Sequence, residues 1–370
     1  AVRPGNLAAR GIYLLPGPRE LRWQSRLPYT FPSGSTVSKR ITPTEITELI
    51  DILCQKLRAN YIFPEIAEKI CHNLHQHQKA GEYEDISDGE LLALALTIHL
   101  QEVNHDEHLW VRWHADPLPA DADQLRNNQQ WQEERQLEAR LDNFGIYKVD
   151  RLPGNIGYLD IQYLHRPEWG REAATAAMGL LANTNALIID LRKCQGGYPG
   201  MVALLCSHLF GAEPLLITSI YWRDEDITQQ YWTEPTAPDK RCETQPVFVL
   251  ISKATFSGGE LLAHVLQSRS RATLIGERTD GGAHAGAAYR LAPHFEAFIP
   301  IGRTIDPLSS SDWEDHGIIP QIARSSEQAL EVAYRMALES VIASLGDPAS
   351  EPLRQLRDEA QAALDKLEAP

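Results

Sequence analysis

Ser257 stands where the surrounding sequence would suit a nucleophile. Val247–Ile251 is a continuous apolar run rich in β-branched and aromatic side chains, which predicts a strand buried on both faces. After a short connection come Ser257, Gly258 and Gly259, and a helical pattern starts at Glu260. A helix that begins there directs backbone N–H groups and its positive dipole end toward the hydroxyl, as a nucleophile beside an oxyanion hole requires. The alternative interpretation is an N-cap serine followed by a glycine turn.

A second glycine turn is expected near this serine. The apolar run Ala186–Leu191 predicts another buried strand, and Gly196 and Gly197 follow it. From Asn155 onward strands alternate with helices, which predicts right-handed crossovers and a largely parallel sheet. Ligands bind at the carboxyl ends of the strands in such sheets, so the glycine pair and Ser257 are expected at one edge.

Asp106, Glu107 and His108 form a compact polar group at the end of an expected helix. The next residues, Leu109–Trp113, alternate like a strand, so the group occupies a helix-to-strand junction. An imidazole there is a candidate general base or metal ligand, as is that of His105. A surface or capping role is the ordinary alternative for such a histidine.

Other candidate metal ligands lack a convincing pattern. Three histidines fall on one expected helix, but only two share a face, so a solvated face is favoured over a metal site. These are His72, His75 and His77, of which the first two share the face. The five cysteines are scattered without CxxC spacing, which predicts buried free thiols. No nucleotide or flavin motif occurs either, so neither a metal nor a cofactor is predicted.

Composition restricts the classes of partner. The chain has 370 residues, a formal net charge of −15, 43% apolar residues and 23% charged residues, which fits a globular protein of two or three domains. The negative charge argues against nucleic acid or an anionic membrane as the main partner. No apolar run reaches about 18 residues, so no membrane span is expected. The cytoplasm is favoured as the compartment, while a periplasmic or secreted location stays open if a leader was removed.

The chain divides into five expected regions by composition and periodicity. They are an irregular N-terminal arm (1–40), a helical domain (41–114), a polar connector with one exposed helix (115–152), an α/β catalytic domain (153–346) and a C-terminal helix (347–370). Capping boxes at Thr42–Glu45 and Ser87–Glu90 open two of three expected N-terminal helices. Short antiparallel helices of this kind pack as a bundle.

Periodicity also places the elements of the α/β region. The expected strands are 156–163, 186–191, 215–222, 247–251, 272–276 and 295–301. The expected helices are 171–182, 201–210, the helix that follows Ser257 and ends at 268, and 326–345. Residues 223–245 are expected to be a polar loop. The glycine-rich stretch 276–286 indicates close backbone approach.

Several motifs in a fixed order carry a resemblance to a known family. The chain resembles the serine peptidases that include the tail-specific C-terminal-processing proteases, the tricorn core protease and the interphotoreceptor retinoid-binding protein, and it is most similar to the last branch. The motifs are RANYIFPEIAEKI, HDEHL, ALIIDLRKCQGG, ATFSGGE, GERTDGGAHAG, IPIGRTIDP and WEDHGIIPQI. The resemblance implies an α/β fold, a crotonase-like ββα superhelix catalytic domain, with a small N-terminal three-helix bundle and no PDZ domain.

The resemblance also implies a nucleophile and an oxyanion hole. Ser257 matches the family nucleophile, and the N–H of Gly258 with that of Gly196 or Gly197 would form the oxyanion hole. The tail-specific branch uses a lysine as base, and Gly282 occupies the aligned position here. A Ser–Lys dyad is therefore not expected at that position.

The tricorn-like branch implies a histidine base. On that pattern His108 is the base and Glu314 an indirect orienter of its ring. Glu107 replaces the usual glycine and puts a charge beside the base, with Asp106 preceding it. His284 is the second candidate base. In the DLRKCQGG turn, Cys194 occupies the position where asparagine is common in the family.

Three functions are compatible with these residues. The first is a serine hydrolase that cleaves a peptide or peptide-like amide or ester through an acyl-enzyme on Ser257. The second is a non-catalytic binder of an apolar, retinoid-like or fatty-acid-like ligand, against which the intact serine, histidine and glutamate set argues. The third is a biosynthetic enzyme that acts on a small acyl intermediate, which the sequence does not separate from the first.

Overall fold

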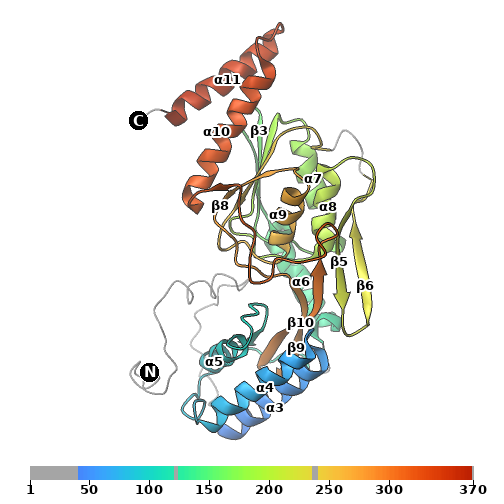
Figure 1. Ribbon diagram of the computed structural model, residues 1–370, viewed down its shortest axis with the longest axis vertical. Coiled ribbons are helices and arrows are strands. Elements are labelled where there is room, and N and C mark those ends of the chain that lie inside the picture. The colour runs from blue at the N-terminus through green and yellow to red at the C-terminus, as the bar shows by residue number, and fades with distance from the viewer. Residues whose placement is uncertain (1–40, 121–123, 236–240, 369–370) are drawn as a thin grey trace. The chain divides into compact units, whose positions relative to one another are not determined.

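A computed structural model describes residues 41–120, 124–235 and 241–368, and these form two compact units (Figure 1). The first unit contains the described residues up to Arg135 together with 220–229 and 284–304. The second contains 136–219, 230–235, 241–283 and the described residues from Ile305 onward. The expected N-terminal arm lies outside the described residues. The five contiguous regions expected from the sequence stay predictions.

Three helices open the first unit, as predicted. They are α3 (Pro43–Asn60), α4 (Pro64–Lys79) and α5 (Gly89–Gln101). The Thr42 capping box is confirmed, since Thr42 and Glu45 cap one another. The cap expected at Ser87 is wrong by one residue, because the Asp88 side chain accepts the Leu91 N–H. Apolar faces of all three helices meet in one core, and α3 and α4 lie side by side in Figure 1.

Antiparallel strands complete the core of the first unit. β1 (Trp110–Trp113) and β9 (His284–Ala292) both pair with β10 (Phe295–Ile305). β1 and β10 were expected, whereas β9 was not, because its glycines and alanines resemble a loop in the sequence. Inward side chains such as Tyr289 and Ile299 nevertheless pack on the helices.

The α/β pattern expected from the sequence is wrong at two strands. β5 (Leu216–Trp222) does not join the parallel sheet but belongs to the five-stranded sheet, whose order is β1-β10-β5-β6 with β9 on β10. The polar loop expected over 223–245 is wrong in part, because β6 (Ile227–Trp232) lies within it. β6 is the last strand in this order, and most of its side chains are exposed. Its sequence therefore lacks the apolar alternation that marks a strand.

A six-stranded sheet forms the centre of the second unit. Its order is β11-β8-β7-β4-β3-β2, and every pair is parallel except β2–β3. The strands are β2 (Ile146–Leu152), β3 (Ile156–Ile161), β4 (Ala186–Asp190), β7 (Val247–Ile251), β8 (Thr273–Gly276) and β11 (Ile322–Ala323). The prediction of a largely parallel sheet is confirmed. Within the residues expected as a polar connector, the structure has the expected helix as α6 (Gln129–Leu141), and β2 follows it.

Side chains that alternate along the strands separate two helical layers. In β4, Leu187 and Ile189 pack with the layer of α7, α8 and α9, while Ala186 and Ile188 pack with that of α10 and α11. The five helices are α7 (Pro167–Leu181), α8 (Pro199–Leu209), α9 (Gly258–Ser268), α10 (Ser326–Leu345) and α11 (Glu351–Glu368). The mixed α/β class with a helical N-terminal region is thus as expected. Among the described residues, no helix is long and apolar enough to span a membrane.

Candidate active site

Ser257 occupies a strained backbone position at the start of α9. Its φ is +51° and its ψ is −118°, in a region that residues with a Cβ rarely adopt. Such a conformation costs about 1–3 kcal/mol and persists only where neighbouring contacts enforce it. One of these contacts is the hydrogen bond from the Ser257 N–H to Glu260 Oε2, at 2.8 Å. The alternative expected from the sequence is also confirmed, since Ser257 is the N-cap of α9 in a capping box with Glu260. An N-cap residue ordinarily has an extended backbone, so capping alone does not require this strain.

The glycine turn after β4 lies directly against Ser257, as the sequence predicts. A Cβ built on Gly196, whose φ is +107°, would lie 2.7 Å from Ser257 Cβ. A Cβ built on Gly258 would lie 2.7 Å from Gly197 O and 3.0 Å from Gly197 N. Real Cβ atoms do not approach so closely, so the backbones of both turns meet only because these positions are glycine.

Hydrogen bonds tie the connection before Ser257 to this glycine turn. The Phe256 N–H donates to Cys194 O at 3.0 Å, and Thr255 Oγ1 donates to Leu191 O at 2.8 Å. Ser252 Oγ donates to Arg192 O at 2.6 Å. Because these bonds join the ends of adjacent parallel strands, Ser257 and the glycines are held in one fixed arrangement.

Cys194 fills the position where the resemblance led us to expect asparagine. Its side chain is fully buried and lies beside Gly259, where an added Cβ would approach Sγ to 2.9 Å. Burial raises the pKa of its thiol to about 12, so the sulfur stays protonated and serves as a packing group. The backbone N–H of Cys194 donates to Leu191 O at 2.9 Å within this turn.

Glu260 is a site residue that sequence reasoning did not single out. Its side chain is fully buried, and four donors bind its carboxylate: the N–H groups of Ser257, Gly281 and Gly282 at 2.8 Å each, and Thr279 Oγ1 at 2.5 Å. Burial raises its pKa to about 7, and the four donors oppose that rise. The available signal was the S-x-x-E spacing from Ser257, which is that of a capping box.

Glu314 holds the same glycine-rich segment from another loop. Its Oε2 accepts the Ala283 N–H at 2.5 Å, and the neighbouring Trp313 donates Nε1–H to Gly282 O at 3.1 Å. Within the second unit Glu314 thus binds the backbone of the segment that carries the lysine-equivalent Gly282. The role expected for it, as an orienter of His108, stays a prediction.

In the first unit Asp106 is the centre of a buried polar cluster. Its side chain is 1% exposed. Oδ2 accepts Tyr61 O–H at 2.8 Å and His284 Nδ1–H at 3.0 Å, and Oδ1 accepts the His108 N–H at 3.0 Å. Asn104 donates to the Tyr61 oxygen at 2.7 Å, which extends the network. Both candidate bases are therefore attached to one carboxylate, one through its ring and the other through its backbone.

The carboxylate of Asp106 is kept ionised in spite of its burial. Desolvation alone would raise its pKa, but hydrogen bonds from His284 and Tyr61 and the nearby His108 outweigh it, so the net direction is downward. The Glu107 side chain is only partly buried. Asp106 places a negative charge beside His108, since its Oδ1 accepts the His108 N–H.

The predicted site residues fall into two groups. Ser257, Gly196, Gly197 and Gly258 meet in the second unit, where Glu314 and Glu260 hold the adjoining segment. Asp106, His108 and His284 meet in the first unit. Backbone N–H groups beside a serine hydroxyl can stabilise a developing oxyanion, and an imidazole on a buried carboxylate can accept a proton.

Curated relatives of the chain are C-terminal-processing enzymes. Carboxyl-terminal-processing peptidase 1 of Arabidopsis thaliana chloroplasts is 27% identical over 191 residues, which are 50% of this chain and 37% of the relative. A carboxyl-terminal-processing protease of Synechocystis sp. is 27% identical over 173 residues, 46% of this chain and 38% of the relative. The chain thus spans less than two fifths of the length of these relatives. Among solved structures, the tricorn protease matches 88% of this chain and 37% of its own, with 12% identity and a TM-score of 0.48.

Two family profiles match adjoining parts of the chain. The profile described as the N-terminal domain of peptidase S41 in eukaryotic IRBP matches residues 41–152. The profile described as peptidase family S41 matches residues 155–324, which include both glycine turns and Ser257. With both profiles in sequence along most of its length, the chain belongs to peptidase family S41 and carries the N-terminal domain of the IRBP type.

Proposed function

We propose that this protein is a serine hydrolase of the peptidase type, which cleaves a peptide or peptide-like amide or ester through an acyl-enzyme on Ser257. The observation that carries the proposal is the strained Ser257 backbone, held at a φ of +51° against the Gly196–Gly197 turn. Strain of this kind concentrates at functional sites, and serine nucleophiles of other hydrolases also occupy sharp turns between a strand and a helix. Membership of family S41 supports the same reaction.

The reaction uses Ser257 Oγ as the attacking atom. Oγ adds to the carbonyl carbon of the substrate, and the negative oxygen of the tetrahedral intermediate is stabilised by the Gly258 N–H with that of Gly196 or Gly197. The C–N or C–O bond to the leaving group then breaks and leaves an ester on Ser257. Attack by water on this ester releases the acid and restores the hydroxyl.

We assign the general base to His108, which takes the Oγ proton and returns it to the leaving group. Asp106 supports the assignment, because its ionised carboxylate binds the His108 backbone and stabilises an imidazolium nearby. We assign to Glu314 the role of positioning the base indirectly. Glu314 binds the backbone of Ala283, which directly precedes His284, and His284 binds Asp106.

One observation favours His284 as an alternative base. Its Nδ1–H donates to the buried Asp106 carboxylate, which is the arrangement that fixes the tautomer of a catalytic imidazole and makes Nε2 the nitrogen that accepts a proton. The tail-specific mechanism is not proposed, because residue 282 is glycine and its N–H is bound by Glu260.

Active-site labelling with a fluorophosphonate tests the proposal. We expect one probe per chain on Ser257 and complete loss of labelling in Ser257→Ala. Ser268→Ala is the matched control, because this serine ends the same helix and bonds only to the Val265 carbonyl in the described structure. If the wild-type protein is not labelled and instead co-purifies with an apolar ligand, the catalytic proposal fails in favour of the binding function.

A further inference from the structure

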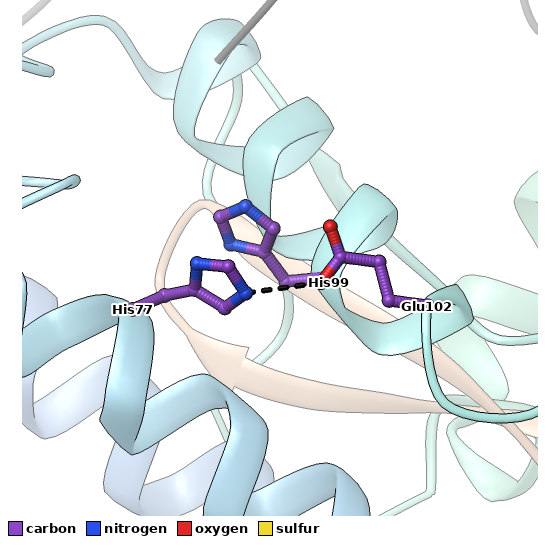
Figure 2. Close-up of side chains that lie close together, drawn as sticks. All are labelled: His77, His99 and Glu102. Carbon is purple, nitrogen blue, oxygen red and sulfur yellow. Dashed lines mark hydrogen bonds and ion pairs between the residues drawn. The ribbon is translucent and has the colours of Figure 1, made fainter. Parts of the chain in front are cut away.

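Two imidazole rings stack against each other at one end of the three-helix bundle (Figure 2). His77 lies in the last turn of α4 and His99 in the last turn of α5, and both belong to the first unit. The ring centroids are 3.6 Å apart and the ring planes differ by 3°. The solvated face expected for the α4 histidines is therefore wrong for His77, whose ring covers that of His99.

A proton on His77 is compensated by two carboxylates. Its Nδ1 lies 2.8 Å from Glu82 Oε2, and its Nε2 lies 3.0 Å from Glu102 Oε2, as Figure 2 shows for the second contact. A carboxylate oxygen only accepts hydrogen bonds, so both contacts together require the imidazolium, which has an N–H at each ring nitrogen. Desolvation opposes ionisation of Glu102, but hydrogen bonds from Asn73 and His77 outweigh it and lower the pKa of this carboxyl group. Glu102 thus stays charged in mild acid.

A second proton, on His99, is not compensated in this way. The Tyr83 hydroxyl forms a hydrogen bond with His99 Nδ1 at 2.7 Å, and burial raises the pKa of Tyr83, so this partner is uncharged. Glu82 Oε2 is 3.7 Å from His99 Nε2, which is longer than a hydrogen bond. From α3, Cys54 adds no charge, because a hydrogen bond to a neighbouring thiol and burial raise the pKa of its own thiol. The His99 side chain is only 5% exposed, so a second positive ring would face that of His77 with little water to screen it.

The same contacts explain how His99 titrates. Burial and the adjacent His77 lower the pKa of His99 from the ordinary 6.5 to about 4, although Glu102 and Glu82 act in the opposite direction. The stacked arrangement therefore binds this proton less tightly than an opened one. Its stabilisation by a neutral His99 is complete above about pH 6.5 and decreases as the pH falls to about 4.

The stacked pair also holds the connection between α4 and α5, residues 80–88. Glu82 and Tyr83 lie in this connection, and they bind the histidines of α4 and α5 respectively. The Tyr83 side chain is buried in the core that the three helices share. Separation of the two rings would therefore free the connection from both helices.

We propose that His77 and His99 form an acid-sensitive latch, which keeps the connection 80–88 closed at neutral pH and releases it when His99 takes the second proton. The repulsion between two charged rings opens the latch, and the carboxylates of Glu82 and Glu102 are sufficient for only the first proton. The proposal does not depend on the hydrolase reaction, because no residue of the latch belongs to the proposed catalytic set.

Hydrogen–deuterium exchange of the full-length protein tests the latch. The amides of Glu82 and Ile86 are bonded to backbone carbonyls, so their exchange reports opening of the connection. Between pH 6.5 and pH 4.5, we expect exchange of 80–88 to increase by about 10- to 100-fold beyond the change in intrinsic rate, because linkage allows up to about tenfold per pH unit in this window. His99→Phe keeps a ring in the stack that cannot take a proton, and it should abolish this increase.

His72→Phe is the matched control, because this exposed histidine of α4 bonds to Gln76 and lies outside the stack. It should keep the increase seen in the wild type. Circular dichroism at neutral pH shows whether each variant is folded.

Titration of the histidine ring resonances by NMR provides a second measurement, which does not require the His99→Phe protein. His99 of the wild type should titrate near pH 4, and His77→Gln, which removes the facing charge, should move this titration toward 6.5. Unchanged exchange of 80–88 in the wild type at pH 4.5, equal increases in wild type and His99→Phe, or a titration of His99 that is the same in His77→Gln would overturn the proposal.

Discussion

Asp106 Oδ2 accepts the Nδ1–H of His284 at 3.0 Å, although 178 residues separate them in sequence. The same oxygen accepts the hydroxyl of Tyr61, the residue that caps α3. A loop after α5, the end of α3 and the start of β9 thus converge on one carboxylate. The hydrogen-bonded pair is buried, with side-chain exposures of 6% for His284 and 1% for Asp106, so removal of either partner has a large expected cost.

Asp106→Asn is expected to lower the free energy of unfolding by about 3–5 kcal/mol at neutral pH, because it leaves a buried imidazole without its carboxylate. The pKa of Asp106 is lowered in the folded state, so its stabilisation is fully present above the ordinary value of 3.8 and is lost as the pH falls through the folded value. Urea unfolding at several pH values measures both effects. A double-mutant cycle with His284→Ala should give a clear coupling energy, and additive losses would contradict the pairing.

Glu260 should make stability depend on pH in the opposite sense. Its folded-state pKa of about 7 exceeds the ordinary 4.5, so the folded protein binds the proton more tightly. Its contribution to the free energy of unfolding therefore falls as the pH rises from about 4.5 to about 7. Glu260→Gln should abolish this slope, and it should cost about 1–3 kcal/mol because an amide NH₂ would face backbone N–H donors.

Chemical denaturation across this pH window measures the effect of Glu260→Gln. Glu339→Gln, which alters an exposed carboxylate of α10, is the control and should keep the wild-type slope. Equal slopes for wild type and Glu260→Gln would show that Glu260 does not titrate in this range.

Local sequence signals were sufficient to predict the helices and the parallel sheet. The capping box at Thr42 and the run Val247–Ile251 each indicate one structure strongly, and the structure has both. β6 and β9 could not be recognised in the same way. β6 is largely exposed, and β9 begins in a glycine- and alanine-rich stretch, so neither shows the apolar alternation that marks a strand.

The residues of the candidate site could be predicted from the sequence only to the same extent. Ser257 and its glycines were found because they adjoin in sequence and follow buried strands. Glu260 was missed because its importance comes from Thr279, Gly281 and Gly282, which only the folded chain brings to it. His77 was assigned to a solvated face because its partner His99 lies on another helix. Contacts between distant segments leave no mark in local periodicity.

Gly196→Ala should impair both folding and reaction with the fluorophosphonate. The new methyl group would lie 2.7 Å from Ser257 Cβ, and the φ of +107° is strained for any residue with a Cβ. We expect a loss of about 1–3 kcal/mol or more in the free energy of unfolding, from the strain alone. Gly179→Ala is the control, since a Cβ there meets no atom within 4 Å, and it should stabilise α7 by about 0.5–1 kcal/mol. A Gly196→Ala protein of normal stability and reactivity would argue against close packing of the two turns.

Separate replacement of the two imidazoles should identify the general base. If His108 takes the proton from Ser257, His108→Ala should lower the rate of fluorophosphonate labelling by about 10²- to 10⁴-fold while the fold is retained. His284→Ala should then lower the rate less, since that ring acts through Asp106, and most of its effect should appear in stability. The rates are compared at saturating probe and under conditions where circular dichroism shows both variants folded. The reverse order of effects would assign the base to His284 and leave His108 as a structural residue on Asp106.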